Sequence, residues 1–260
     1  MKRRDFVIKS SLAAAAVSSA SSGFAYINKY VGSSAPIRIG VIGTGDRGGG
    51  LISVMKDIEG IEVAACCDVI PFRLANGIKR AGDSAKAYTD YRKLLEDKSI
   101  DAVLVATPFS THAQIELDAL AAGKHVYGEK TMAKGYDAVL DVVDAAQGNL
   151  VFQTGHQYHS SRLYTHVVDL IKDGKIGEIT AFECQWNRSG NWRRPVPEPE
   201  LERMINWRMY REYSGGLTAE LCSHQIDFTN WVLGETPSQV FGAGGIDYWK
   251  DGRETFDNVH

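Results

Sequence analysis

Short apolar runs alternate with amphipathic segments over residues 37–153, and this alternation predicts the order of elements. The apolar runs that favour buried strands lie at 37–42, 61–68, 87–88, 102–106, 125–127 and 150–153. Apolar positions three and four residues apart predict helices between them, at 51–55, 73–81, 91–96, 111–122 and 134–147. Strict alternation of short strands with helices is typical of an α/β fold with a doubly wound parallel sheet.

The pattern changes after Gly155. All five tryptophans lie beyond residue 185, so the second half has its own aromatic character. Its periodicity predicts helices at 161–173 and 217–232, and strands at 179–186 and 240–248. We therefore expect a second, α+β domain. Because residues 258–260 resemble a strand without a sheet's worth of partners, we expect a sheet that is incomplete in this chain.

The first 34 residues have the layout of an export signal and a linker. Arg3 and Arg4 precede a short alanine-rich stretch, an arrangement that fits the twin-arginine route for folded proteins. We expect a periplasmic or secreted protein. The apolar stretch is too short for a stable span, and the first 65 residues hold no cysteine for a lipid, so we expect no membrane anchor.

Composition narrows the function classes. The 260 residues are 44% hydrophobic and 23% charged, as in ordinary globular proteins, and the net charge of −3 supplies no basic surface for nucleic acid. The cysteines match no zinc spacing, and we expect no metal. Cys66, Cys67 and Cys184 are interpreted as small core residues, and Cys222 is considered with the helix that carries it.

A glycine-rich loop follows the first strand and opens the first helix. It consists of Gly43, Thr44, Gly45, Asp46, Arg47 and Gly48. The first glycine permits the tight turn, the second lets backbone amides approach a pyrophosphate, and the third allows close packing of helix on strand. The alternative is a glycine turn that only packs. With a strand before it and a helix after it, the loop predicts a Rossmann domain over residues 35–155 that binds a dinucleotide.

Asp68 indicates which dinucleotide. It ends the second strand, 20 residues after Gly48, where its carboxylate can accept from both ribose hydroxyls and repel a 2′-phosphate. The sequence therefore favours NAD. NADP remains the alternative, because Arg47 and Arg73 could neutralise that phosphate.

Two further loops lie at carboxyl ends of predicted strands, where such sheets bind cofactor. Thr107 and Pro108 follow the fourth strand, and His112 opens the next helix, either near the cofactor or only capping and packing. Glu129 and Lys130 follow the fifth strand, which places the ammonium beside the nicotinamide, where it would favour a developing alkoxide. Glu129 can pair with Lys130. The alternative is a surface Glu–Lys pair in a loop.

These motifs together resemble the Gfo/Idh/MocA oxidoreductase family. The resemblance covers about residues 37–260 and implies an NAD(P)-dependent enzyme of sugars and polyols, with a Rossmann domain before an α/β domain built on a large open sheet. The family's Glu-Lys-Pro triplet has Thr131 in place of proline. Its Asp-x-x-x-His pair maps onto Glu220 and His224, with Glu220 replacing the aspartate and Cys222 standing where glycine is common.

The spacing of Glu220, His224 and Asp227 places them on one helical face. An imidazole titrates near neutral pH and can take a hydroxyl proton while a nearby carboxylate stabilises the imidazolium. The alternative is a capped helix with a core histidine. This spacing, the nearby Lys130 and the resemblance together predict Lys130, His224 and Glu220 as catalytic residues. Asp227 is interpreted as structural.

The second domain, over 156–260, is expected to bind the substrate. His156, Tyr158 and His159 follow the sixth strand, where in the family the chain crosses between domains. Trp192 and Arg193 lie in a loop whose aromatic and guanidinium groups suit sugar faces and hydroxyls, although domain or subunit packing is an equal alternative.

The function expected is oxidation of a sugar or glycoside hydroxyl with NAD that stays bound and is recycled, because free cofactor is not supplied outside the cytoplasm. One alternative is an NAD-using glycoside hydrolase that works by oxidation, elimination and rereduction. Another is a non-catalytic sugar-binding module. Family habit further implies a homo-oligomer. The sugar, the hydroxyl and the second substrate are not fixed by the sequence.

Overall fold

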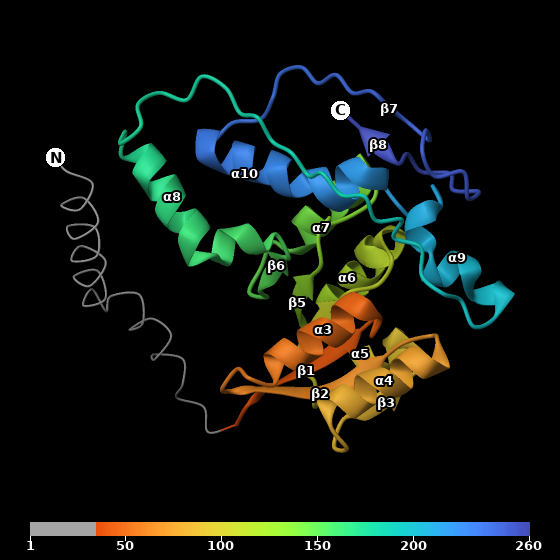
Figure 1. Cartoon of the computed structure of the whole chain (residues 1–260). Coiled ribbons are helices and arrows are strands. Elements are labelled where there is room, and N and C mark those ends of the chain that lie inside the picture. The colour runs from red at the N-terminus through yellow and green to blue at the C-terminus, as the bar shows by residue number, and fades with distance from the viewer. Residues whose placement is uncertain (1–34) are drawn as a thin grey trace, which may run out of the picture.

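The computed structural model describes residues 35–260, so the expected twin-arginine signal and linker at 1–34 lie outside the described residues. Six parallel strands form one sheet in the order β3-β2-β1-β4-β5-β6. The strands are β1 (Ile37–Ile42), β2 (Ile61–Cys67), β3 (Lys86–Tyr88), β4 (Ala102–Val105), β5 (His125–Gly128) and β6 (Phe152–Thr154). The predicted doubly wound Rossmann sheet is confirmed (Figure 1).

Helices connect successive strands and cover both faces of the sheet. They are α3 (Asp46–Met55), α4 (Pro71–Ala81), α5 (Tyr91–Glu96), α6 (His112–Ala121) and α7 (Tyr136–Ala145), with a 3-10 turn at Phe109–Thr111 before α6. Apolar side chains of α3 and α4 pack on one face, and those of α5 and α6 pack on the other. All carboxyl ends of the strands therefore meet at one edge, where the loops after β1, β4 and β5 lie together.

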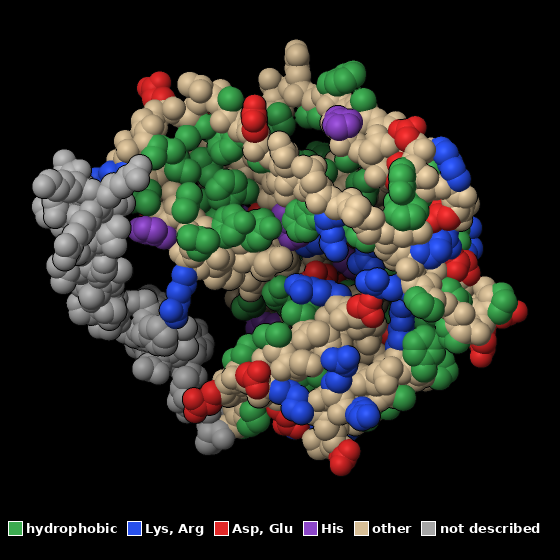
Figure 2. All heavy atoms as spheres, in the orientation of Figure 1, with side chains coloured by type: hydrophobic (Ala, Val, Ile, Leu, Met, Phe, Trp, Pro, Cys, Tyr) green, Lys and Arg blue, Asp and Glu red, His purple; other side chains and the backbone are tan. Residues whose placement is uncertain are grey.

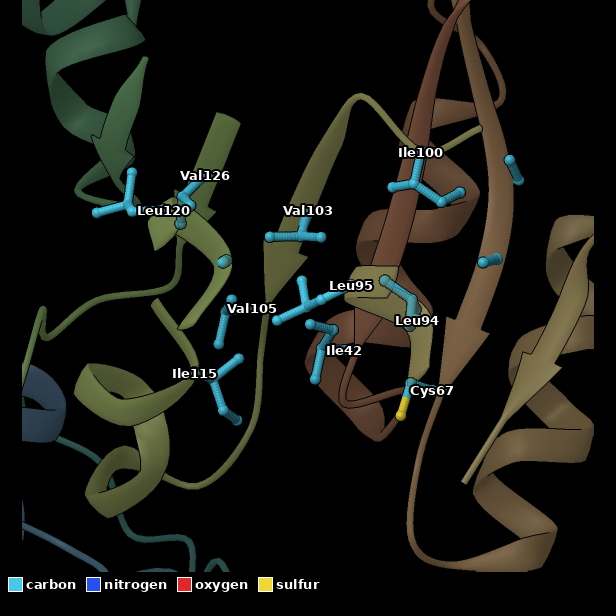
Figure 3. Packing of buried hydrophobic residues seen from close by; sticks show 13 residues of the cluster. Ile42, Cys67, Leu94, Leu95, Ile100, Val103, Val105, Ile115, Leu120 and Val126 are labelled. Carbon is cyan, nitrogen blue, oxygen red and sulfur yellow. The ribbon is translucent and has the colours of Figure 1, made fainter. Parts of the chain in front are cut away.

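The core follows from the two-residue period of the strands. Val103 and Val105 pack toward α5 and α6, whereas Leu104 between them packs toward α3 and α4. Cys66 and Cys67 likewise point to opposite faces, and both are buried thiols. Figure 3 shows the α5 and α6 side of this core, with Leu94 of α5 and Ile115 of α6 among the strand residues.

The second half of the chain combines separate helices with long stretches that have no regular structure. It contains α8 (Arg162–Lys172), α9 (Glu202–Ile205), a π-helical turn (Thr218–Cys222) that leads into α10 (Ser223–Leu233), 3-10 turns (Gln157–Ser160, Pro199–Leu201, Trp207–Met209), and the strands β7 (Gly244–Gly245) and β8 (Asn258–Val259). Helices α8 and α10 lie beyond β6, on the side away from β3 (Figure 1). Two helices predicted here are thus confirmed, the second one beginning with a π turn.

Two predicted strands are wrong. Residues 179–186 have no regular structure, and of 240–248 only β7 is a strand, paired antiparallel with β8. A strand is stable only when its backbone groups bond to a neighbour, and within the described residues no second strand lies beside 179–186. Cys184, interpreted as a core residue, is exposed for the same reason. The large open sheet is represented in the described chain by the β7–β8 pair alone.

A hollow separates the Rossmann domain, at the bottom of Figure 2, from the rest of the described chain, and Lys and Arg side chains gather along it. No helix among residues 35–260 has the length and the apolar character needed to cross a bilayer. The hollow opens onto the carboxyl edge of the sheet, and the loops there carry the candidate residues.

Candidate active site

The glycine loop between β1 and α3 has the shape that a dinucleotide requires. Gly43 has a φ of +88°, and a Cβ on it would lie 2.7 Å from the Ala106 carbonyl oxygen. A Cβ on Gly48 would lie 1.9 Å from the Gly43 carbonyl oxygen, so only glycine lets α3 pack this closely on β1. The amino end of α3 thereby faces the carboxyl edge of the sheet, and its backbone N–H groups suit a pyrophosphate. The residues present fit the cofactor.

Asp68 lies at the end of β2 and is 9% exposed. One carboxylate oxygen accepts from the backbone N–H of Thr44 at 2.8 Å, and the other accepts from that of Ile70 at 2.9 Å. The carboxylate therefore fixes the glycine loop against the start of α4. Arg73 lies close by, with its guanidinium 3.4 Å from the position a Cβ would take on Gly45. A negative and a positive group thus flank the place expected for the adenosine ribose.

The sequence suggested that Glu129 pairs with Lys130, but in the structure it does not. Its carboxylate binds the guanidinium of Arg47 at 2.7 Å, which joins the loop after β5 to the first turn of α3. Glu129 is 7% exposed, and buried carboxylates are stable when a cation pairs with them. The reason is geometric, because Lys130 extends the other way, toward the second half of the chain. Arg47, used in this pair, is less available for a 2′-phosphate.

His112 connects the loops after β4 and β5. Its ring is 2% exposed, with Nδ1 2.9 Å from the Thr131 carbonyl oxygen and Nε2 3.0 Å from that of Thr107. Burial lowers the pKa of His112, so the ring is neutral and donates to one of these carbonyls. The Thr107 hydroxyl accepts from Thr111, and Pro108 begins the turn into α6. This geometry gives His112 a positioning role for the two loops.

The loop after β5 is bonded to the π-helical turn. The Lys130 ammonium donates to the Glu220 carbonyl oxygen, and the Thr131 hydroxyl donates to that of Ala219 at 2.8 Å. A π turn often lies at functional sites, and here two of its carbonyls find donors outside the helix. Burial lowers the pKa of Lys130, and the charge of Glu220 partly offsets that effect. The residue that replaces the family's proline therefore holds the helix that carries His224.

The Glu220 side chain pairs with an arginine of the 3-10 turn Trp207–Met209. Its carboxylate, 8% exposed, binds Nε of Arg208 at 3.1 Å. The sequence suggested a carboxylate that stabilises the His224 imidazolium, but in the structure the Glu220 carboxylate is bound by the Arg208 guanidinium. Arg208 is a site residue that sequence reasoning missed, and no motif around it could have indicated the pair.

His224 lies in a box of aromatic rings and is 5% exposed. Trp186 stacks on it with ring centroids 5.8 Å apart, Tyr158 lies tilted at 5.1 Å, and His156 meets it edge-on at 5.8 Å. Its Nδ1 has no hydrogen-bond partner among the described residues. Burial, then the charge of Lys130, lowers the pKa of His224 to about 4. The imidazole is therefore neutral and able to accept a proton.

The structure brings together three of the five predicted substrate residues. His156 and Tyr158 contact His224, and His159 pairs with Asp227 at 3.0 Å while stacking on Trp231 at 4.2 Å. Asp227, left as structural, thus holds a predicted site residue. The His159–Asp227 pair borders a pocket of about 500 Å³ that Asn230 and Glu235 also line. Trp186, at the end of the strand predicted over 179–186, is not among the predicted site residues, and its aromatic ring was the available signal.

Trp192 and Arg193 lie apart from this cluster. The Arg193 guanidinium binds Glu202 and, at 3.3 Å, Asp251. Within the described residues, neither Trp192 nor Arg193 has a hydrogen bond or ion pair with Lys130 or His224. Trp192 has a φ of +69°, and the guanidinium of Arg188 lies 5.8 Å from its ring centroid. The geometry of Trp192 and Arg193 therefore indicates packing within the second half of the chain. In residues 35–260, no three His, Cys, Asp or Glu side chains converge on a metal-sized site.

Comparisons with known proteins agree with this arrangement. A family model described as the oxidoreductase family with an NAD-binding Rossmann fold matches residues 37–156, and the GFO/IDH/MocA C-terminal domain matches 164–260. The chain is 25% identical, over 78% of its length and 54% of the relative's, to an inositol 2-dehydrogenase/D-chiro-inositol 3-dehydrogenase from Lactiplantibacillus plantarum. It is 30% identical, over 70% of its length and 41% of the relative's, to a glycosyl hydrolase family 109 protein from a Shewanella species.

A solved structure shares the fold. Scyllo-inositol dehydrogenase from Lactobacillus casei, with bound NAD(H) and scyllo-inositol, superposes with a TM-score of 0.64 at 26% identity, covering 80% of this chain and 59% of that one. The chain thus spans about half the length of the curated relatives it matches. The two family models cover both halves of the described chain. It follows that this protein is a member of the Gfo/Idh/MocA family of NAD-binding oxidoreductases.

Proposed function

We propose that this protein oxidises a hydroxyl of a sugar, glycoside or related polyol with NAD, using Lys130 and His224. The observation that carries the proposal is their placement. A half-buried ammonium and a buried neutral imidazole lie at the carboxyl edge of the sheet that bears the dinucleotide loop, close enough for the charge of Lys130 to lower the pKa of His224. The inositol dehydrogenases among the relatives support a polyol-like substrate.

The reaction converts a C–OH group into C=O. Bound NAD⁺ supplies the oxidant, since its nicotinamide accepts the hydride from carbon. Lys130 donates a hydrogen bond to the substrate oxygen, which favours the alkoxide character that develops as hydride leaves. The His224 imidazole, which is neutral, takes the hydroxyl proton. One hydride and one proton thus leave the substrate, and each has an acceptor.

Glu220 acts on this pair through its surroundings. Its backbone carbonyl oxygen accepts a hydrogen bond from the Lys130 ammonium, and its carboxylate accepts one from Nε of Arg208. The negative charge favours the protonated form of Lys130, against the effect of burial. We infer that Glu220 positions Lys130 and keeps its ammonium protonated, and that Glu220 does not itself accept the proton.

NAD is favoured over NADP by the charges around the adenosine end. Asp68 is fixed by two backbone amides, so its carboxylate cannot easily turn away from a 2′-phosphate. Arg47 is engaged by Glu129. Arg73, whose guanidinium lies near Gly45, favours the phosphate.

We also propose export through the twin-arginine route with the cofactor bound, on the strength of Arg3 and Arg4 and the alanine-rich stretch that follows. Retention outside the cytoplasm requires a dissociation constant of about 1 nM, roughly −12 kcal/mol. The reduced cofactor is then reoxidised on the protein by a second carbonyl compound.

A second candidate is glycoside hydrolysis, which the 30% identity to a family 109 glycosyl hydrolase favours. Oxidation beside the anomeric centre acidifies a ring C–H, elimination expels the aglycone, and water addition with rereduction returns the cofactor to its first state. Lys130 and His224 serve both schemes. The hydrolase scheme needs no second carbonyl compound, because hydride returns to the same sugar.

The experiment incubates the full chain with NAD and aryl glycosides, inositols and aldoses, with and without a carbonyl acceptor. Oxidation predicts NADH or reduced acceptor together with a keto product. Hydrolysis predicts phenol release with no net redox change and no need for an acceptor. Lys130→Met and His224→Asn should abolish either activity. If both variants keep the wild-type rate, the assigned site is wrong.

A further inference from the structure

One segment of the second half reaches from the candidate catalytic residues to the dinucleotide loop. It runs between α8 and α9, passing α10 on the way (Figure 1). At Trp186 it stacks on the ring of His224, with an interplanar angle of 19°. At Arg194 it meets the Rossmann domain, where Nε lies 3.0 Å from the Asp46 carboxylate. Residues 186–194 therefore span the two ends of the site, and we call them the crossing segment.

The end of the crossing segment at Arg194 is firmly held. Asn206, 2% exposed, accepts from the Arg194 backbone N–H at 2.6 Å and donates to its carbonyl oxygen at 3.0 Å. Asn206 in turn donates to the Glu202 carboxylate. Because the backbone is fixed from its own side, only the Arg194 side chain extends across to α3. The contact with Asp46 joins residues 148 positions apart.

Asp46 is the first residue of α3, directly after Gly45. A pyrophosphate bound at this helix end is negatively charged, so a carboxylate beside it repels it. Arg194 neutralises that carboxylate and adds a guanidinium, which is the group best suited to phosphate oxygens. The side chains of Arg194 and Asp46 are 58% and 77% exposed, so both are accessible to a ligand in the hollow.

We propose that Arg194 is a cofactor-binding residue contributed by the second half of the chain, which binds the dinucleotide pyrophosphate at the start of α3 and fastens the crossing segment over it. The inference rests on the proposed function and deepens it, since it names the group that retains the cofactor. It separates retention from chemistry, because Arg194 lies at the other end of the segment from His224.

The test measures NADH dissociation from the full chain. Protein loaded with NADH is mixed with excess NAD⁺, and the loss of bound-NADH fluorescence gives the rate constant. The variants are Arg194→Ala, Arg194→Asp, and the charge exchange of Asp46→Arg with Arg194→Asp. Arg188→Ala is the matched control, since Arg188 is an arginine of the same segment whose described contact is the Trp192 ring.

Arg194→Ala should release NADH about tenfold faster or more, as expected for the loss of a charge-assisted phosphate contact. Arg194→Asp should release it faster still, because two carboxylates then face the phosphates. The charge exchange should restore slow release, and Arg188→Ala should match the wild type. Raising the salt concentration should reduce the difference between Arg194→Ala and the wild type.

Release from Arg194→Ala at the wild-type rate overturns the inference and leaves the proposed function intact. An equal increase in Arg188→Ala also overturns it, because general loosening of the segment would then be the cause. If the wild-type chain binds neither NADH nor NADPH, the proposed function fails and this inference with it. Circular dichroism of each variant, compared with the wild type, distinguishes a lost contact from a lost fold.

Discussion

Glu116 is the buried group whose replacement should change stability most clearly. It lies on α6 and is 0% exposed, and neither carboxylate oxygen has a hydrogen-bond partner among the described residues. The carboxyl group occupies the space above Gly128 of β5, where a Cβ would lie 2.0 Å from Oε1. Burial raises the pKa of Glu116 to about 8. The folded protein therefore holds this carboxyl group protonated at neutral pH.

The magnitude follows from proton linkage. A folded-state pKa of about 8 against 4.5 in the unfolded chain means that the folded state binds the extra proton between these values. The contribution to stability is complete below pH 4.5 and is lost as the pH rises through 8. Between pH 5 and pH 8 the free energy of unfolding should fall by about 3 kcal/mol from this group alone.

The assay is urea unfolding of the wild type and Glu116→Gln between pH 5 and pH 8. The amide has nearly the same shape but does not titrate, so the constant cost of burying it cancels when the two pH profiles are compared. The difference between them should change by about 3 kcal/mol over this range, in favour of Glu116→Gln at high pH. Glu59→Gln, which removes an exposed carboxylate, is the control. Parallel profiles for the wild type and Glu116→Gln would refute the reasoning.

Three further predictions concern the site. The oxidation rate of the wild type should fall only below a pH of about 4, where His224 becomes protonated, and Lys130→Met should raise the pKa of His224; stopped-flow pH profiles of the wild type measure the first, an NMR titration of the His224 ring in both proteins measures the second, and an unshifted pKa contradicts the charge coupling. Thr131→Val should lower kcat/KM about fivefold, because the lost hydrogen bond to the π turn is worth about 1 kcal/mol. Thr131→Ser keeps the hydroxyl and should retain activity. Equal rates for the two variants would exclude a positioning role for Thr131. Asp68→Asn should improve NADPH binding relative to NADH about tenfold in fluorescence titrations, by removing a charge near the 2′ position, and an unchanged ratio counts against the assignment of Asp68.

The Rossmann half was predictable because its signals are local. Each strand is a short apolar run. At 43 and 48 the glycines themselves indicate a positive φ or a close approach of backbone that a side chain would prevent. The contacts made by Glu129 and Glu220 were not predictable. Each carboxylate pairs with an arginine that is distant in the sequence or on another element.

The second half was harder for a related reason. The alternation in 179–186 has the period of a strand, but a strand requires a neighbour that the described chain does not place there. Trp186 shows the consequence, since it packs on His224 instead of in a sheet. Only the folded structure reveals that its loop joins the candidate catalytic residues to the dinucleotide loop.

The central claim is that the glycine loop, Lys130 and His224 form one site where a dinucleotide meets a hydroxyl group. The most direct measurement mixes NAD-loaded protein with a saturating mixture of inositols and aldoses and records absorbance at 340 nm in a single turnover. The wild type should form up to one equivalent of NADH per chain, and Lys130→Met loaded to the same extent should form none. A wild-type chain that takes up no dinucleotide, or a Lys130→Met chain that forms NADH at the wild-type rate, would contradict it.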